Sequence, residues 1–333
     1  MHIAVTGSIA TDHPTVFPGR FADQLIPGQL DHISLSFLAD TLEVRRGGVA
    51  ANIAVGLARL GLSPLLVGAA GKDFDDYDVW LQKSGVDSRA VRISDTLHTA
   101  RFMCTTDADN NQIATFYAGA MTEARHITIA SLNEYAGPPE LVVIAPNDPE
   151  AMLRHTAECR EIGLPFAADP SQQLARLDRE ETRSLVEGAE FLFTNEYEAA
   201  LLRERTGWTD SQVFARCGTW VTTRGAGGVA VLRENRPELL VGAVPTASPA
   251  PDQRHLRSVR DIRGRADSDR SVTAAPAEPG RVAEWSESSQ HQALPRWPRP
   301  RRSEHRFDVG VEWSRTAARQ AEATPSATGR LGP

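Results

Sequence analysis

The chain has 333 residues, of which 41% are hydrophobic and 24% charged, and its formal net charge is -7. These values are typical of a soluble globular protein, and the negative charge argues against a nucleic-acid partner. No segment approaches the length of apolar sequence that spans a membrane. The three widely spaced cysteines and the absence of a basic, apolar leader favour a cytoplasmic location.

Residues 1–245 alternate between short apolar runs and amphipathic stretches, which predicts strands followed by helices. The expected strands are residues 2–6, 65–69, 141–145, 165–168, 191–194, 220–223 and 229–233. The expected helices begin near residues 49, 74, 149, 172 and 196, and glycines 61, 85 and 163 end the first three. This order is typical of an α/β fold with a mostly parallel sheet flanked by helices.

Two β-rich runs interrupt the alternation without a helix between them. Residues 99–105 and 112–117 are separated by the polar turn sequence DADNN, which predicts a hairpin. Together with residues 34–38 and 42–45 they are expected to form a small β lid, with strands near 34–45 and 99–117. Lids of this kind close over substrates and exclude water.

The composition changes near residue 250. Residues 246–333 contain ten Leu, Ile, Val and Phe residues in 88, together with nine prolines and many arginines. This is under the roughly 20% below which chains tend to stay disordered. We therefore expect one folded domain over residues 1–250 and a disordered Arg/Pro-rich tail over 251–333.

The first chemical motif is RRGGVAAN, in which Gly47 and Gly48 precede a helix and Asn52 lies in its first turn. Paired glycines let the backbone approach a ligand closely because no Cβ intervenes. The Asn52 amide can both donate and accept hydrogen bonds. An ordinary turn followed by a solvent-facing asparagine explains the same residues.

A second motif, TGSIATD, follows the first expected strand and contains Ser8 and Asp12. Ligands bind at the carboxyl ends of strands in open α/β sheets, where an aspartate can accept two sugar hydroxyls. A turn or a helix cap is the alternative role for Asp12. The segment has no G-x-G-x-x-G pattern, so it does not predict a dinucleotide site.

Two further motifs follow later strands. In FTNEYE, Asn195 and Glu198 share one helix face, and a carboxylate there can hold Mg²⁺ through water. The alternative is a first-turn glutamate favoured by the helix dipole. The Gly-rich sequence TTRGAGG, residues 222–228, is not a Walker A loop and by itself is weak support for a phosphate site.

The order and spacing of these motifs resemble the ribokinase-like (PfkB) family of sugar and nucleoside kinases. The closest resemblance is to the adenosine kinases of actinobacteria, and it extends from Met1 to about Ala250. It rests on the segments GSIATDH, SLSFL, RGGVAAN, TARFMCTTD, AADPSQQLARL and FTNEYE. It implies a ribokinase-like fold with ATP-dependent phosphorylation of the 5′-hydroxyl of adenosine, which gives AMP for purine salvage.

The resemblance also implies a substrate site. It implies that Asp12, Gly48 and Asn52 hold the ribose hydroxyls. Ser8 and Ser36 would line the nucleoside pocket, and the lid aromatics Phe102 and Phe116 would stack on the purine. Gln172 and Gln173 would contact the ligand from below. The two aromatics could equally form lid core. A kinase acting on free sugars has less need of them, so they favour a nucleoside.

For the phosphate donor, the resemblance implies ATP binding by Asn195, Thr223, Gly225 and Gly228. Glu198 would organise Mg²⁺ and phosphate. Lids of related proteins often pair two subunits, so a homodimer through the lid is one expectation.

One hallmark of the family is missing. A motif of the form DTxGxGD, whose last Asp takes the hydroxyl proton, should begin near Ala250, but no GxGD occurs after that point. Asp252 and Asp261 are the nearest acids, and neither has glycines upstream. We therefore assign no catalytic base, and catalysis by this chain is in doubt. A reading-frame shift near codon 250 is our hypothesis for the change, since the chain has only two lysines, which points to GC-rich DNA.

Three other interpretations stay open at this point. The substrate could be ribose or another sugar, or the chain could bind a nucleoside without transferring phosphate. The arginine-rich tail could instead be a basic interaction segment, although acidic residues are interspersed along it.

Loss of the family's C-terminal helices would also expose one face of the sheet and promote association.

Overall fold

The computed structural model describes residues 2–26, 28, 31–234 and 236–243. The expected tail of residues 251–333, with its predicted disorder, lies outside them. Across the described part of the chain, no helix combines the length and apolar character needed to cross a bilayer.

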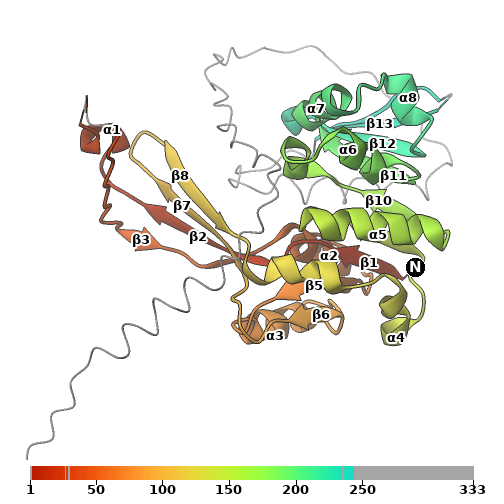
Figure 1. Ribbon diagram of the computed structural model, residues 1–333, viewed down its shortest axis with the longest axis horizontal. Coiled ribbons are helices and arrows are strands. Elements are labelled where there is room, and N and C mark those ends of the chain that lie inside the picture. The colour runs from red at the N-terminus through yellow and green to blue at the C-terminus, as the bar shows by residue number, and fades with distance from the viewer. Residues whose placement is uncertain (1, 27, 29–30, 235, 244–333) are drawn as a thin grey trace, which may run out of the picture. The chain divides into compact units, whose positions relative to one another are not determined.

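The main sheet, within the described residues, has nine strands in the order β14-β13-β12-β11-β10-β9-β1-β5-β6 (Figure 1). Their bounds are β1 Ile3–Thr6, β5 Leu65–Ala70, β6 Val91–Ile93, β9 Leu141–Ile144, β10 Phe166–Ala168, β11 Phe191–Asn195, β12 Thr219–Thr223, β13 Val229–Arg233 and β14 Leu239–Val241. Strands from β12 to β6 pair in parallel, and β13 and β14 are antiparallel additions. The predicted mostly parallel α/β sheet is confirmed.

Four of the five expected helices are α-helices in the structure, and the one expected near residue 172 is not. The α-helices are α1 Phe21–Gln24, α2 Val49–Arg59, α3 Asp75–Lys83, α4 Asn133–Ala136, α5 Pro149–Glu161, α6 Arg179–Val186, α7 Glu196–Thr206 and α8 Asp210–Phe214. Short 3-10 helices are η1 Gly119–His126, η2 Ala130–Leu132, η3 Ser171–Ala175 and η4 Gly225–Gly227. Pro149 occupies the first turn of α5, where its missing N–H costs nothing. Gly207, in the left-handed region, ends α7.

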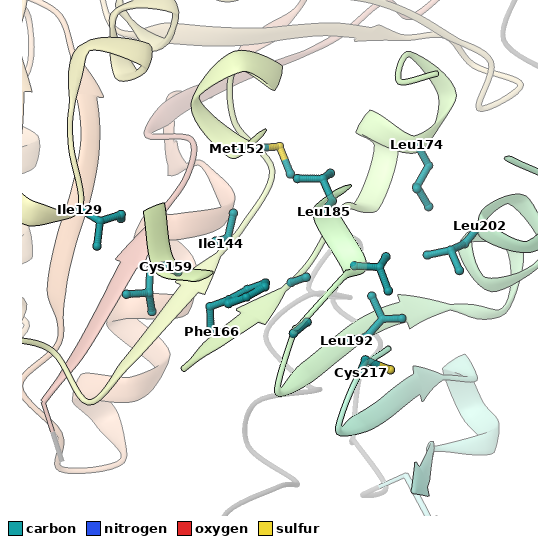
Figure 2. Close-up of a cluster of buried hydrophobic side chains, with 14 of the residues drawn as sticks. Ile129, Ile144, Met152, Cys159, Phe166, Leu174, Leu185, Leu192, Leu202 and Cys217 are labelled. Carbon is teal, nitrogen blue, oxygen red and sulfur yellow. The ribbon is translucent and has the colours of Figure 1, made fainter. Parts of the chain in front are cut away.

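Both faces of the sheet carry core side chains. On one face, Ile144, Phe166 and Leu192 of the strands pack with Leu185 of α6 and Leu202 of α7 (Figure 2). On the other, a second cluster joins residues of β1 and β5 to helices α2 and α3: Val5, Leu66, Ile53, Leu57 and Leu81. Alternate strand residues thus point to opposite cores, as expected for a sheet covered on both faces.

A second sheet contains the hairpin expected for the lid, and we call this sheet the lid. It has five strands in the described residues: β2 Ala10–Val16, β3 Thr41–Leu42, β4 Arg45–Gly47, β7 Ala100–Thr106 and β8 Gln112–Tyr117. The long strands β2, β7 and β8 lie side by side in Figure 1. The expected hairpin is β7–β8, whereas β2 pairs in parallel with β7 and antiparallel with β3 and β4.

Two local expectations were wrong, and one strand was not expected. Residues 34–38 form no strand, because Phe37 packs against the rings of Phe17 and Phe21 instead. The central lid strand is β2, whose polar sequence ATDHPTV gave no strand signal. In addition, residues 171–175 form a single 3-10 stretch and not an α-helix.

Candidate functional site

The candidate residues gather where the parallel strands end. Ser8 follows β1, Asn147 follows β9, Asp169 follows β10, and Asn195 and Thr223 are the last residues of β11 and β12. Because the sheet order is β12-β11-β10-β9-β1, these positions form one row along the carboxyl edge. This edge is where open α/β sheets bind ligands.

Ser8 serves first as a cap for α2. Its Oγ accepts the Val49 N–H at 3.0 Å, and its carbonyl oxygen accepts the Ala50 N–H at 3.2 Å. The N-cap position is Gly48, which has no side chain to do this. Gly48 has φ +91°, and a Cβ on it would stand 2.5 Å from the Ser8 carbonyl oxygen. Only glycine fits this crossing of two backbones.

Asp12 lies on β2 opposite the second glycine segment. β4 pairs with β2, which places Gly47 against Ala10 and Arg45 against Asp12. A Cβ on Gly47 would come within 2.5 Å of Asp12 Oδ2 and 2.8 Å of Oδ1. The glycine therefore leaves room for the Asp12 carboxylate next to the backbone.

The two lid aromatics stand in the same cross-strand row as Asp12. Asp12 pairs with Phe102 of β7, and Phe102 pairs with Phe116 of β8. Residues directly opposite across neighbouring strands share one face of a sheet. Phe116 is 51% exposed, so it is not lid core. One face of the lid therefore carries a carboxylate followed by two rings.

Asn52 and Ser36 have different surroundings. Asn52 is half-buried on α2, and we find no side-chain hydrogen bond from it to another described residue, so its amide is available. Ser36 is exposed on the irregular segment before β3. No hydrogen bond or ring contact among the described residues joins Ser36 to Phe102 or Phe116.

The two glutamines of η3 are not equivalent. Gln173 is buried and donates from Nε2 to the Asn147 carbonyl oxygen at 2.9 Å. Gln173 Oε1 and Asn147 Nδ2 are both buried without a hydrogen-bond partner in the described structure. Gln172 Oε1 accepts the Ser171 hydroxyl at 2.9 Å. An unmatched acceptor and an unmatched donor lie in neighbouring segments, which is unusual unless water or a ligand completes them.

Asn195 and Glu198 form a capping box at the start of α7. Asn195 Oδ1 accepts the Glu198 N–H at 2.8 Å, and Glu198 Oε2 accepts the Asn195 N–H at 2.7 Å. Glu198 Oε1 also accepts the Ser171 hydroxyl at 3.3 Å. Ser171 has φ +43°, a strained value for a residue with a Cβ. The pair therefore has a structural role in addition to any ligand role.

Asp169 adds a second carboxyl group near Glu198. Burial, together with the negative charge of Glu198, raises the pKa of Asp169 to about 8. Two carboxyl groups that repel each other suit a divalent cation, since its charge removes the repulsion. Within the described part of the chain, no three His, Cys, Asp or Glu side chains are grouped to hold a metal. A hard cation here would need oxygen ligands from water and phosphate as well.

The Gly-rich turn after β12 is shaped by two glycines. Gly225 has φ +52° and open space where its Cβ would stand, whereas Gly228 has φ +86° and its Cβ would meet the Val241 carbonyl oxygen at 2.0 Å. Gly228 therefore lets the turn pack on β14. Thr223 pairs with Asn195 in register, so the two turns lie next to each other.

Two residues of this row were missed by sequence reasoning. Asn147 and Asp169 each follow a buried strand, in the segments APND and AADP. Their position directly after an apolar run was the one sequence signal that could have identified them as site residues. The burial of Asn147, its unpaired Nδ2 and the raised pKa of Asp169 depend on packing between distant segments, which no local pattern contains.

Known proteins resemble this chain in sequence and in fold. The model of the pfkB family of carbohydrate kinases matches residues 24–249. A nucleoside kinase of Methanocaldococcus jannaschii is 28% identical over 57% of this chain and 62% of its own length. One of Methanothermobacter thermautotrophicus is 34% identical over 46% and 49% respectively. The chain thus spans about half to three fifths of these curated relatives.

Solved structures agree with this match. The nucleoside kinase of Burkholderia thailandensis in complex with inosine is 32% identical, with a TM-score of 0.64 over 74% of this chain and 77% of that one. A ribokinase of Thermotoga maritima, 20% identical, has a TM-score of 0.57 over 74% and 78%, which supports the ribokinase-like fold. Since the family model matches more than half of the sequence, the chain belongs to the pfkB family of carbohydrate kinases.

Proposed function

We propose that the chain descends from, and is built as, an ATP-dependent nucleoside kinase that phosphorylates the 5′-hydroxyl of adenosine. One observation carries the proposal: Asp12, Phe102 and Phe116 stand in one row on one face of the lid. A carboxylate binds the vicinal hydroxyls of a ribose, and aromatic rings stack on a purine. The similar Burkholderia enzyme was solved with inosine, also a purine nucleoside.

In this proposal the chain's own residues position both substrates. Asp12, Gly48 and Asn52 hold the ribose, and the lid rings cover the base and exclude water. Ser8, which caps α2, lines the pocket. Gln172 and Gln173 contact the ligand from η3. Ser36 belongs to the proposed site only by its place in the sequence. Positioning of this kind supplies much of the catalysis of phosphoryl transfer.

The phosphate donor would lie along the neighbouring strand ends. Asn195, Thr223 and the turn with Gly225 and Gly228 are the proposed ATP contacts. Glu198 and Asp169 are the carboxyl groups that fit Mg²⁺, held through water. When bound, that ion neutralises charge on the transferring phosphate.

A second function is favoured by the missing motif. The sequence contains no GxGD, so no residue is assigned to take the proton from the 5′-hydroxyl. A protein with an intact nucleoside site and no base would bind adenosine without consuming ATP. We therefore keep a non-catalytic nucleoside-binding protein as the second candidate.

One experiment separates these functions. Binding of adenosine, inosine and ribose is measured by calorimetry, and ADP release is measured with each ligand in the presence of MgATP. Saturable adenosine binding with ADP release supports the kinase, and binding without release supports the second candidate. Preference for ribose over adenosine would contradict the nucleoside assignment and favour a sugar kinase.

We also propose that the lid pairs two copies of the chain in the cytoplasm. The lid face opposite Asp12 exposes the apolar side chains of Leu42, Met103, Ile113 and Tyr117. An apolar face of this kind on a sheet marks an interaction surface. Light scattering of the wild type and of Met103→Glu tests it, because a monomer in both proteins would contradict the proposal.

A further inference from the structure

Tyr77 joins helix α3 to the glycine segment of the nucleoside site. Its side chain is only 5% exposed, and its hydroxyl donates to the Gly47 carbonyl oxygen at 2.8 Å. The ring packs between Phe74 and Trp80, with centroids at 5.6 and 5.8 Å. The Arg46 guanidinium lies over the Tyr77 and Trp80 rings, at 6.0 and 5.2 Å from their centroids. The phenol is therefore held firmly in place.

The electrostatic surroundings keep this phenol a donor. Burial raises the pKa of Tyr77 above its usual range, the charge of Asp12 raises it further, and Arg46 opposes the shift. The phenol and the Asp12 carboxylate both lie next to Gly47. Tyr77 thus stands on the carbonyl side of Gly47 while the Asp12 carboxylate occupies the place of its Cβ.

This arrangement fixes more than one atom. The peptide between Gly47 and Gly48 is planar and rigid, so a bond to its carbonyl oxygen also sets the direction of the Gly48 N–H. Glycine has the widest backbone freedom of any residue, so two in succession would otherwise sample many conformations. The next residue, Val49, already opens α2. Tyr77 removes the freedom that this double glycine would otherwise retain.

We propose that Tyr77 is a positioning residue for the ribose hydroxyls: its bond to Gly47 holds the glycine pair in the geometry that meets Asp12. The proposal rests on the nucleoside-binding function given above. A merely structural Tyr77 would stabilise α3 against β4 without affecting which nucleosides bind. A positioning role predicts that loss of the Tyr77 hydroxyl weakens only ligands with ribose 2′- and 3′-hydroxyls. A merely structural role predicts the same effect on ligands that lack them.

The test compares Tyr77→Phe with Tyr135→Phe. Tyr135 is half-buried on α4, and its hydroxyl makes no hydrogen bond to another described residue. Calorimetry gives the affinities for adenosine, 2′,3′-dideoxyadenosine and ADP. We expect Tyr77→Phe to weaken adenosine about five- to tenfold, the range of one lost hydrogen bond. Dideoxyadenosine and ADP should bind as before, and Tyr135→Phe should change none of the three.

Hydrogen exchange of the ligand-free proteins provides a readout independent of nucleoside binding. We expect faster exchange in residues 46–50 of Tyr77→Phe and no change in residues 219–223. Equal losses for adenosine and dideoxyadenosine, or unchanged exchange, would overturn the role of Tyr77 and leave the proposed function standing. If the wild type binds no adenosine, the proposed function fails, and the ribose role of Tyr77 fails with it.

Discussion

The Asp12 carboxylate lies where a side chain on Gly47 would have to be, with Oδ2 2.5 Å from the ideal Cβ position. The antiparallel pairing of β2 with β4 brings the two residues together although 34 residues separate them in the sequence. Any side chain at position 47 would displace this carboxylate. The closeness of Asp12 to the Gly47 backbone therefore explains why position 47 requires a glycine.

We expect Gly47→Ala to impair nucleoside binding. The added methyl must displace the Asp12 carboxylate, and overpacking of this kind costs about 1–3 kcal/mol. Adenosine affinity should fall about tenfold or more, while ADP affinity is retained. Gly242→Ala is the control, because that Cβ would meet no atom within 4 Å. Unchanged adenosine binding in Gly47→Ala would contradict the assignment of Asp12.

Phe102→Ala should distinguish a nucleoside from a sugar. Phe102 shares its lid face with Asp12, and stacking of a base on an aromatic ring contributes about 1–3 kcal/mol. We expect adenosine to bind about tenfold more weakly in this variant, with no change for ribose. Thr115→Ala is the control, since Thr115 lies opposite Met103 on the other lid face and is not among the proposed pairing contacts. Equal weakening of both ligands would indicate that the ring only supports the lid.

Local patterns predicted the fold better than they predicted the site. Parallel strands such as Leu141–Ile144 are continuous apolar runs, and helix ends such as Gly85 have their own residue signals. β2 was missed because its partners are β7, about 90 residues later, and β4, so its polar sequence is explained only by nonlocal pairing. The buried, unpaired atoms of Asn147 and Gln173 likewise arise from the meeting of distant segments.

Buried His155 should make stability depend on pH. Its Nδ1 lies 3.0 Å from Thr6 Oγ1 and its Nε2 3.0 Å from the Ile127 carbonyl oxygen. Burial lowers the pKa of His155 below its usual value, so the unfolded chain binds a proton more readily than the folded one. The stability from neutral His155 is therefore present above about pH 6.5 and is lost as the pH falls below it.

Thermal melting between pH 5 and 8 checks this expectation. Below about pH 6.5 the melting temperature of the wild type should fall relative to that of His155→Gln, because the opposite slope that comes from the raised pKa of Asp169 is common to both proteins. The control is His126→Gln, because His126 is exposed at the end of η1. The same slope in all three proteins would show that other groups cause the acid sensitivity.

We expect the purified chain to associate or to be poorly soluble. Phe191 and Phe193 of β11 point away from Leu192 and belong to none of the core clusters of the described residues. An apolar sheet face of this kind favours association with another apolar surface, because association removes it from water. Light scattering and thermal melting of the same preparation test this. A monodisperse monomer with a single cooperative transition would contradict it.

The reading-frame hypothesis makes a separate prediction about the coding DNA. The family match ends at residue 249, and the composition changes at nearly the same place. We expect another frame of codons 230–270 to encode GxGD at the start of an amphipathic helix. A protein expressed from the restored frame should release ADP with adenosine, because the glycine amides and the Asp supply the anion site and the base. If no frame contains the motif, the base is truly absent and adenosine binding without ADP release is the expected behaviour.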